Sequence, residues 1–391
     1  MQADHEKVAL ILFLLTFFLI YGGLHFYMFI KVKTSFLPGT KSTLCLILFM
    51  MIMVFAPVVI RILERGGYES LARLFSYVGY SWMGIVFLFF SLAVLFDVYR
   101  FSVYATGFVL NRDLSFVTPS ALHSCVIPLV FAVLVSSYGY FEAQNIHTER
   151  VVITTSKIPK EIGKLKIVQI SDVHLGLIVR EKRLRKILRK VKAENPDILV
   201  STGDLVDGQI NNLGHFSEML KEIDPKYGKF AVTGNHEFYA GLDEVLDFTA
   251  KSGFKVLRGE GLTISGLINI VGVDDPAEKI YGDSKDISEK EMLSVFPKDK
   301  FTLLLKHQPT VDKKLLGLFD LQLSGHTHKG QIFPFTLITR LRYPFNSGYF
   351  NLSNNTHLYV SRGAGTWGPP VRFLAPPEIT VIELVHGNNQ K

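Results

Sequence analysis

The sequence predicts an α/β domain preceded by transmembrane helices, and two observations lead to this expectation. Apolar runs with few charges fill residues 1–140, whereas residues 150–391 alternate short apolar strands with helical segments and carry mixed charge. The hydrophobic content of the chain, 48% of 391 residues, is high for a soluble protein, and the excess lies in the first part. We therefore expect a helical membrane anchor over residues 1–149 and a globular domain over residues 150–391.

The predicted anchor has about four helices, because four apolar stretches reach or approach the roughly 20 residues that a bilayer-spanning helix requires. They are Val8–Ile30, Thr43–Ile60, Leu74–Phe96 and Ala121–Tyr138. The first stretch is too long for a cleaved signal peptide and others follow it, so an integral, multi-pass membrane protein is expected. Lysines and arginines are nearly balanced between the two sets of loops, which leaves open the side of the membrane that carries the domain.

The overall charge and the cysteines narrow the classes of partner and site. The formal net charge of +7 suits phosphates or anionic lipids. The sequence contains no RNA- or DNA-binding motif, so we expect no nucleic-acid partner. The two cysteines, Cys45 and Cys125, both lie in the apolar part, which excludes disulfides and thiolate metal ligands from the globular domain.

Within residues 150–391, five short apolar strands each end close to a residue that can bind a metal. The strands are Lys166–Ile170, Ile198–Val200, Phe230–Val232, Thr302–Leu305 and Leu321–Leu323. Helical periodicity is found at Glu181–Ala193 and at Leu242–Ala250. Ligands of such α/β sheets bind beyond the carboxyl ends of the strands, so the five strand ends predict one shared site.

The motifs at these strand ends offer oxygen and imidazole ligands. They are Asp172-Val-His174, Gly203-Asp204-Leu-Val-Asp207, Gly234-Asn235-His236-Glu237, Lys306-His307-Gln308-Pro309 and Gly325-His326-Thr-His328-Lys329-Gly330. Taken singly, each has an ordinary structural explanation, such as a turn cap or a surface histidine. Their joint occurrence, in order and at strand ends, favours a metal site. A ligand set without sulfur favours Mn, Fe or Zn.

This series of motifs resembles that of the calcineurin-like metallophosphoesterase superfamily, over roughly residues 150–385. The N-terminal helices, the tail segment 361–368 and the later Pro376-Pro377-Glu378-Ile379 are similar to the branch of transmembrane proteins with a metallophosphoesterase domain. That branch is related to the UDP-2,3-diacylglucosamine pyrophosphatases of lipid A biosynthesis. The resemblance implies a β-sandwich flanked by helices, with two divalent metal ions as cofactors.

The resemblance also implies a ligand set for each ion. One ion would be bound by Asp172, His174 and His328. The other would be bound by Asn235, His307 and His326. Asp204 would bridge the two ions. His236 would protonate the leaving group, and Asp207 would orient His236.

Three basic residues are the candidates for binding substrate: Lys329, Arg362 and Arg372. Lys329 stands where this branch often has glycine, so it can contact a substrate phosphate or simply face solvent, which is the ordinary place for lysine.

The expected reaction is hydrolysis of a phosphodiester or pyrophosphate bond by metal-activated water. The expected substrate is a phosphorylated small molecule or lipid, for instance a lipid linked to a UDP-sugar, and the membrane is the other expected partner. The alternative is a transporter- or channel-like protein with a regulatory phosphoesterase-like domain, although few charges inside the apolar runs argue against an ion path. A metal-binding scaffold without turnover is disfavoured by the presence of His236 and Asp207.

Two segments near the predicted site have two interpretations each. The basic segment Arg180–Lys192 either contacts anionic headgroups or is a surface helix that packs its apolar face on the sheet. The aromatic-rich segment Ile332–Phe350 either serves a lipid-linked substrate or is a hydrophobic flap packed on the domain.

Overall fold

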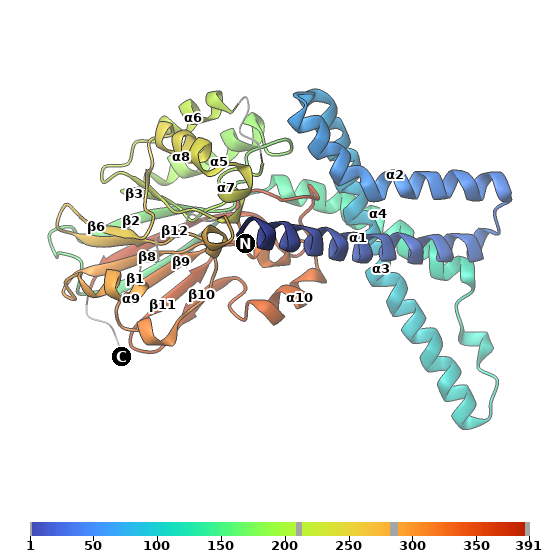
Figure 1. Ribbon diagram of the computed structural model, residues 1–391. Helices are drawn as coiled ribbons and strands as arrows, with labels where there is room; N and C mark the ends of the chain where they lie inside the picture. The colour runs from blue at the N-terminus through green and yellow to red at the C-terminus, as the bar shows by residue number, and fades with distance from the viewer. Residues whose placement is uncertain (1, 209–212, 282–287, 388–391) are drawn as a thin grey trace. The chain divides into compact units, whose positions relative to one another are not determined.

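The computed structural model describes residues 2–208, 213–281 and 288–387, with the backbone alone for residues 2–10 and 13. The chain forms two compact units. The helical unit comprises Met1–Phe141 and Gly368–Phe373, and the sandwich unit comprises Glu142–Trp367 and Leu374–Lys391. Figure 1 shows the elements of both.

The helical unit contains the predicted membrane-spanning segments. Its long helices are α1 (Gln2–Phe36), α2 (Thr40–Arg65), α3 (Glu69–Leu110) and α4 (Ala121–Gln144). In the described part of the chain, four helices are long and apolar enough to cross a membrane. Large apolar side chains such as Leu19, Leu48 and Leu134 are exposed on them, and an extended apolar surface of this kind indicates association with a membrane.

Helix α3 is longer than the stretch Leu74–Phe96 predicted from the sequence. Its 42 residues would extend for about 63 Å at 1.5 Å per residue, which is about twice the thickness of the hydrocarbon core. The predicted apolar stretch ends at Phe96, but the helix continues to Leu110, and the residue after Phe96 has partners on α1. Asp97 accepts a hydrogen bond from the Tyr27 hydroxyl at 2.6 Å and forms an ion pair with Lys31.

The sandwich unit contains two mixed sheets. The first has the order β1-β12-β2-β3-β4-β5, with strands His147–Thr155, Glu378–His386, Lys164–Ile170, Ile198–Ser201, Lys229–Ala231 and Lys255–Val256. The second has the order β10-β11-β9-β8-β7-β6, with strands Gly348–Asn351, His357–Val360, Leu321–Ser324, Phe301–Leu305, Ile268–Gly272 and Glu260–Ile264. The first strand, β1, begins upstream of Arg150, because its residues from His147 onward pair in parallel with β12.

Alternation along the strands builds two layers of core on the first sheet. In β2, Leu165 and Ile167 pack between the sheets, whereas Val168 and Ile170 face the covering helices. These helices are α5 (Glu181–Glu194), α6 (Gly214–Lys221) and α8 (Leu242–Lys251) (Figure 1). A short helix, α9 (Glu289–Ser294), packs on the outer face of the second sheet. The predicted β-sandwich flanked by helices is therefore confirmed.

Helix α5 shows how the basic segment Arg180–Lys192 is used. Its residues Leu184 and Ile187 are buried against the first sheet, as the surface-helix interpretation expected. Arg183 is also buried, and its guanidinium donates a hydrogen bond to the Ala364 carbonyl at 3.0 Å. The exposed basic face is therefore narrower than the sequence indicated.

The carboxyl ends of the parallel strands meet at one edge of the sandwich. In the first sheet β2, β3 and β4 are mutually parallel, and in the second sheet β7, β8 and β9 are. Gln169 joins the two sheets just below this edge, because its side-chain amide donates to Thr202 Oγ1 at 2.8 Å and to the Ser324 carbonyl at 3.0 Å. The loops that follow the parallel strands of the first sheet therefore begin next to the loops that follow the parallel strands of the second sheet.

Candidate metal centre

The loops that carry the predicted ligands have unusual backbone conformations. Five of the predicted metal ligands lie in the left-handed region, with φ between 48° and 70°: Asp172, His174, Asp204, His326 and His328. This conformation costs about 1–2 kcal/mol for a residue with a Cβ. Such strain persists where the surrounding structure fixes the backbone, and it is common at functional sites.

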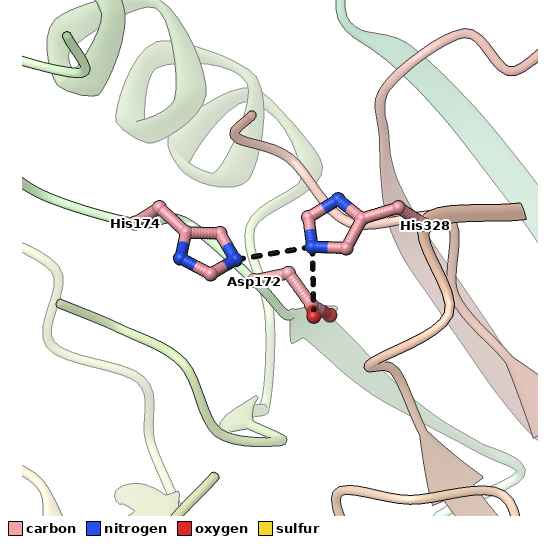
Figure 2. A group of neighbouring side chains, drawn as sticks. All are labelled: Asp172, His174 and His328. Carbon is pink, nitrogen blue, oxygen red and sulfur yellow. Dashed lines mark hydrogen bonds and ion pairs between the residues drawn. The ribbon is translucent and has the colours of Figure 1, made fainter. Parts of the chain in front are cut away.

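The first cluster consists of Asp172, His174 and His328, all of them buried (Figure 2). The Nε2 atoms of the two histidines are 3.0 Å apart, and His328 Nε2 is 3.2 Å from Asp172 Oδ1. His174 Nδ1 lies 3.3 Å from the Asp207 carboxylate, so its proton belongs on that side. The lone pair of His174 Nε2 therefore faces the other two ligands.

The second cluster consists of Asp204, His307 and His326. His307 Nε2 is 3.2 Å from Asp204 Oδ2 and 3.1 Å from His326 Nδ1. His307 Nδ1 donates to the Thr202 carbonyl at 2.7 Å. Nε2 is therefore the nitrogen of His307 that is left to face the rest of the cluster.

The tautomer of His326 is set by Tyr343. The Tyr343 hydroxyl donates to Gln308 Oε1 at 3.0 Å and lies 3.0 Å from His326 Nε2. Because its single proton is used on Gln308, the hydroxyl must accept a hydrogen bond from His326 Nε2. The lone pair of His326 then lies on Nδ1 and faces His307 Nε2.

Asp204 faces both clusters. Its Oδ2 atom is 3.2 Å from His307 Nε2 in the second cluster and 3.8 Å from His174 Nε2 in the first. Its Oδ1 atom accepts the backbone N–H of His236 at 2.9 Å, which fixes the carboxylate plane. One carboxylate oxygen is therefore shared between the ligands of the two clusters.

The turn that carries Asp204 requires a glycine. Gly203 has φ +91°, and a Cβ there would lie 2.6 Å from His307 Nδ1 and 2.7 Å from Gly234 N. Three of the motif loops therefore approach one another at a distance that only glycine permits.

The side chains fit a divalent metal ion. Asn235 Oδ1 is buried and accepts no hydrogen bond from any residue that the structure describes, so this oxygen is available to a cation. The nitrogens of His307 and His326 that lie 3.1 Å apart need a positive charge between them, which either a proton or a metal ion supplies. Carboxylate, amide and imidazole donors without sulfur suit Mn, Fe or Zn.

The pKa shifts of Asp204 and His326 also fit the binding of a divalent metal ion. Burial raises the pKa of Asp204, but the facing His307 and His236 lower it by more, so the carboxyl is ionised. Burial lowers the pKa of His326, and the neighbouring His307 lowers it further, to about 4. His326 is therefore neutral near pH 7, the state in which it can bind a metal.

His236 lies at the rim of the first cluster, and one of its two ring nitrogens is used in a hydrogen bond to Asp207. Its Nδ1–H donates to the Asp207 carbonyl at 2.7 Å, and the Asp207 carboxylate is 3.3 Å away. Burial lowers the pKa of His236, but the carboxylates of Asp204 and Asp207 raise it to about 10. The structure thus brings His236 and Asp207 together, and Nε2 is the nitrogen left to carry a transferable proton.

Glu237 contributes to the site in a way that the sequence analysis missed. Its Oε2 atom accepts the backbone N–H groups of Gly234 at 2.6 Å and Asp204 at 2.9 Å, and its Oε1 atom accepts that of Leu205 at 2.8 Å. The glutamate thus joins two of the ligand-bearing loops. Its position three residues after Gly234 is the capping-box spacing, which was the available signal.

A polar chain behind the second cluster was also missed. It leads from His326 through Tyr343 and Gln308 to Asp275, whose Oδ2 atom accepts the Gln308 amide at 2.9 Å. Asp275 lies in the loop after strand β7 (Ile268–Gly272), next to a second acidic residue, Asp274. A search for polar residues after short apolar strands, extended to Ile268–Gly272, would have indicated Asp275.

The three candidate substrate-binding residues lie in different surroundings. Lys329 directly follows His328 and is half-buried. Arg362 forms ion pairs with Glu378, at 2.5 Å, and with Glu149. Arg372 is fully buried and belongs to the segment Gly368–Phe373 of the helical unit, where its backbone N–H donates to the Gly139 carbonyl at 2.9 Å. Their substrate-binding roles stay predictions.

Comparison with known proteins identifies relatives of the chain. Residues 165–330 match the family described as calcineurin-like phosphoesterase. The chain is 42% identical over 258 residues to an uncharacterized metallophosphoesterase of Aquifex aeolicus, which covers 66% of this chain and 98% of the relative. A similar protein of Campylobacter jejuni is 36% identical over 272 residues, covering 67% of this chain and 71% of its own length. The transmembrane protein with metallophosphoesterase domain of Danio rerio is 31% identical over 282 residues, covering 68% of this chain and 64% of its own.

Proposed function

The chain belongs to the calcineurin-like metallophosphoesterase family, and on that basis we propose that it is a membrane-anchored phosphoesterase that uses two divalent metal ions. The observation that carries the proposal is the position of Asp204, whose Oδ2 atom faces a histidine of each cluster. In this assignment Asp204 would bind both ions. Asp172, His174 and His328 would complete the site of one ion. Asn235, His307 and His326 would complete the site of the other.

Each part of the centre has a distinct chemical task in this proposal. A pair of divalent cations lowers the pKa of a water molecule and withdraws charge from the phosphoryl oxygens. His236 donates a proton from Nε2 to the leaving oxygen, because its Nδ1–H is held by Asp207. Asp207 also faces His174, so one carboxylate orients the acid and a metal ligand together.

The substrate class that we propose is a phosphodiester or pyrophosphate in a lipid-linked molecule, with a multi-pass helical anchor that keeps the enzyme at the bilayer. The four long apolar helices support this placement, as do relatives named as transmembrane proteins. A link to UDP-2,3-diacylglucosamine hydrolysis is one specific form of the proposal and can be tested directly.

The test is hydrolysis by the purified full chain after loading with Mn²⁺, Fe²⁺ or Zn²⁺. We expect metal-dependent release of p-nitrophenol from bis-p-nitrophenyl phosphate, lost on chelation and restored by metal. UDP-2,3-diacylglucosamine, presented in mixed micelles, tests the lipid-linked pyrophosphate. Hydrolysis of neither compound with any of the three metals would contradict the proposal.

A further inference from the structure

A short helix beside the candidate metal centre exposes three large apolar side chains. Helix α10 (Phe335–Arg342) follows the loop that carries His326 and His328. Its threonine Thr336 is buried, whereas Leu337, Ile338 and Leu341 are 55%, 56% and 87% exposed. A surface helix in water normally buries its apolar side, so the outward face of α10 needs an apolar partner.

Hydrogen bonds hold α10 in this orientation. Thr336 Oγ1 donates to the Lys329 carbonyl at 2.7 Å, and Asn346 Nδ2 donates to Thr339 Oγ1 at 2.9 Å. Turning the leucines inward would break both hydrogen bonds and leave the buried side chains of Thr336 and Asn346 without these partners, which costs about 1–3 kcal/mol for each group. The exposed apolar face is therefore fixed by the fold.

The segment that presents this face also holds a metal ligand. Tyr343, the residue directly after α10, lies with its hydroxyl 3.0 Å from His326 Nε2. Lys329, the acceptor for Thr336, is the neighbour of His328. Whatever covers α10 is therefore close to the centre at which we place the reaction.

The charges around the face indicate which partner covers it. Arg340 and Arg342 are exposed on the same helix, and half-buried Lys329 lies at its base. An apolar stripe flanked by basic residues suits an anionic bilayer, where leucines enter the acyl boundary and guanidinium groups meet phosphates. Helices long and apolar enough to cross a membrane are part of the same chain, so a bilayer is always available to the domain.

We propose that α10 is an interfacial helix that inserts Leu337, Ile338 and Leu341 into the surface of a bilayer with anionic headgroups. The seated helix brings the metal centre to the level of lipid phosphates, so that the substrate is a phosphate ester of a bilayer lipid. This second step rests on the proposed phosphoesterase function, whereas the seating of the helix does not.

The seating is tested by the depth of a nitroxide spin label in the full chain, reconstituted into nanodiscs of phosphatidylcholine and phosphatidylglycerol. Cys45 and Cys125 are first replaced by alanine, and the label is attached to Leu341→Cys or, as a control, to Val295→Cys. Val295 is 76% exposed and lies at the end of α9, in the same unit. We expect the label at residue 341 to collide with oxygen rather than with a water-soluble nickel chelate, and the label at residue 295 to do the reverse.

The consequence for catalysis is tested with two substrates that share one scissile bond. Bis-p-nitrophenyl phosphate is soluble, and a diacylglycerol p-nitrophenyl phosphodiester resides in the nanodisc. The variant Leu337→Glu/Ile338→Glu/Leu341→Glu should hydrolyse the lipid about tenfold more slowly or worse, because the buried apolar area sets the strength of interfacial binding. Hydrolysis of the soluble diester should not change, since these side chains point outward. Val295→Glu, and the conservative Leu337→Met/Leu341→Met, should leave both rates unchanged.

The outcomes separate the two proposals. If the label at residue 341 is as accessible to the nickel chelate as the label at residue 295, the proposal that α10 is an interfacial helix is overturned. The interfacial helix is also overturned if the label at residue 341 is shielded from both oxygen and nickel, and if this shielding increases with the number of protein copies in each nanodisc. A second copy of the chain would then cover α10. Equal loss of both activities in the glutamate variant also contradicts it. If the unmodified chain hydrolyses neither diester, the phosphoesterase proposal fails, and the spin-label depth still decides where α10 lies.

Discussion

The carboxylate of Glu237 accepts the backbone N–H of Asp204 at 2.9 Å, directly behind the side chain that faces both ligand clusters. The same carboxylate accepts the N–H groups of Leu205 and Gly234. Burial raises the pKa of Glu237 and the Asp204 charge raises it further, while the N–H donors oppose both effects. The glutamate thus holds the loop of Asp204 against the loop of Asn235 from inside the protein.

Glu237→Gln should therefore weaken metal binding and lower thermal stability. A glutamine has one acceptor oxygen where the carboxylate uses two, so at least one buried N–H would face an NH₂ group. An unsatisfied buried donor costs about 1–3 kcal/mol. Thermal unfolding and metal titration of the variant measure the effect, and Glu244→Gln, an exposed acid on α8, is the control. A Glu237→Gln protein with unchanged metal affinity and melting temperature would show that this contact is dispensable.

His236→Ala should keep the metals and slow hydrolysis by roughly 10²–10⁴-fold for substrates with poor leaving groups. The loss should be smaller for p-nitrophenyl esters, because p-nitrophenolate departs without a proton. The comparison requires rates for a phenyl and a p-nitrophenyl diester with both proteins. An equal loss for the two substrates would argue against a proton from His236.

Tyr343→Phe should lower the affinity of the second cluster for metal by roughly 10- to 100-fold, the usual effect of removing a partner that orients a ligating histidine. The ring is retained, so the change removes the acceptor of the His326 Nε2 proton together with the hydrogen bond that the hydroxyl donates to Gln308. Tyr349→Phe is the matched control, because its hydroxyl contacts His357, which belongs to neither cluster. Competition with a chelator measures the affinity, and equal values for the two variants would rule out this role for Tyr343.

Lys229 should make the stability of the fold depend on pH. The ammonium group is buried and donates to the carbonyls of Leu220 and Ser252, and burial lowers its pKa to about 8. In the unfolded chain its pKa is about 10.4, so the unfolded state binds the proton more tightly between these values. The free energy of unfolding should therefore rise with pH across this window, relative to that of Lys229→Met. Chemical denaturation of both proteins, each treated with a chelator, measures the two free energies of unfolding between pH 8 and pH 10. A difference between them that does not change with pH would refute the prediction.

The local part of the fold could be predicted because it is encoded over short distances. Strand β3 and helix α8 begin at the predicted residues Ile198 and Leu242. An apolar run that stops at a glycine or a charged residue is a signal contained in a few adjacent positions. The convergence of the five motifs followed from the rule that parallel strands present their carboxyl ends together.

Long-range pairing could not be predicted in the same way. Strand β12 (Glu378–His386) lies between β1 and β2, although more than two hundred residues separate it from them in the sequence. Helix α3 continues past its predicted apolar stretch, and Asp97 at that point contacts Tyr27 and Lys31 of another helix. The roles of Tyr343 and Glu237 depend on hydrogen bonds across loops, and a single sequence contains no direct sign of them.

Helix α10 could be predicted in part from the sequence. The composition of Ile332–Phe350 indicated apolar loops near the site, with a packed flap and a segment that serves a lipid-linked substrate as equal alternatives. Only the burial of Thr336, opposite an exposed Leu341, shows which way the apolar side points. Periodicity shows that a helix has two faces, and tertiary hydrogen bonds decide which one is outside.

The most direct test of the two-metal centre is elemental analysis of the purified full chain and of Asp204→Asn after equal loading with Mn²⁺, Fe²⁺ or Zn²⁺. The substitution preserves the shape of the side chain and removes the one carboxylate that faces both clusters among the described residues. We predict two equivalents of metal for each unmodified chain and near-complete loss of both in the variant, with circular dichroism showing that the fold is intact. Two full equivalents in a folded Asp204→Asn protein would contradict the account.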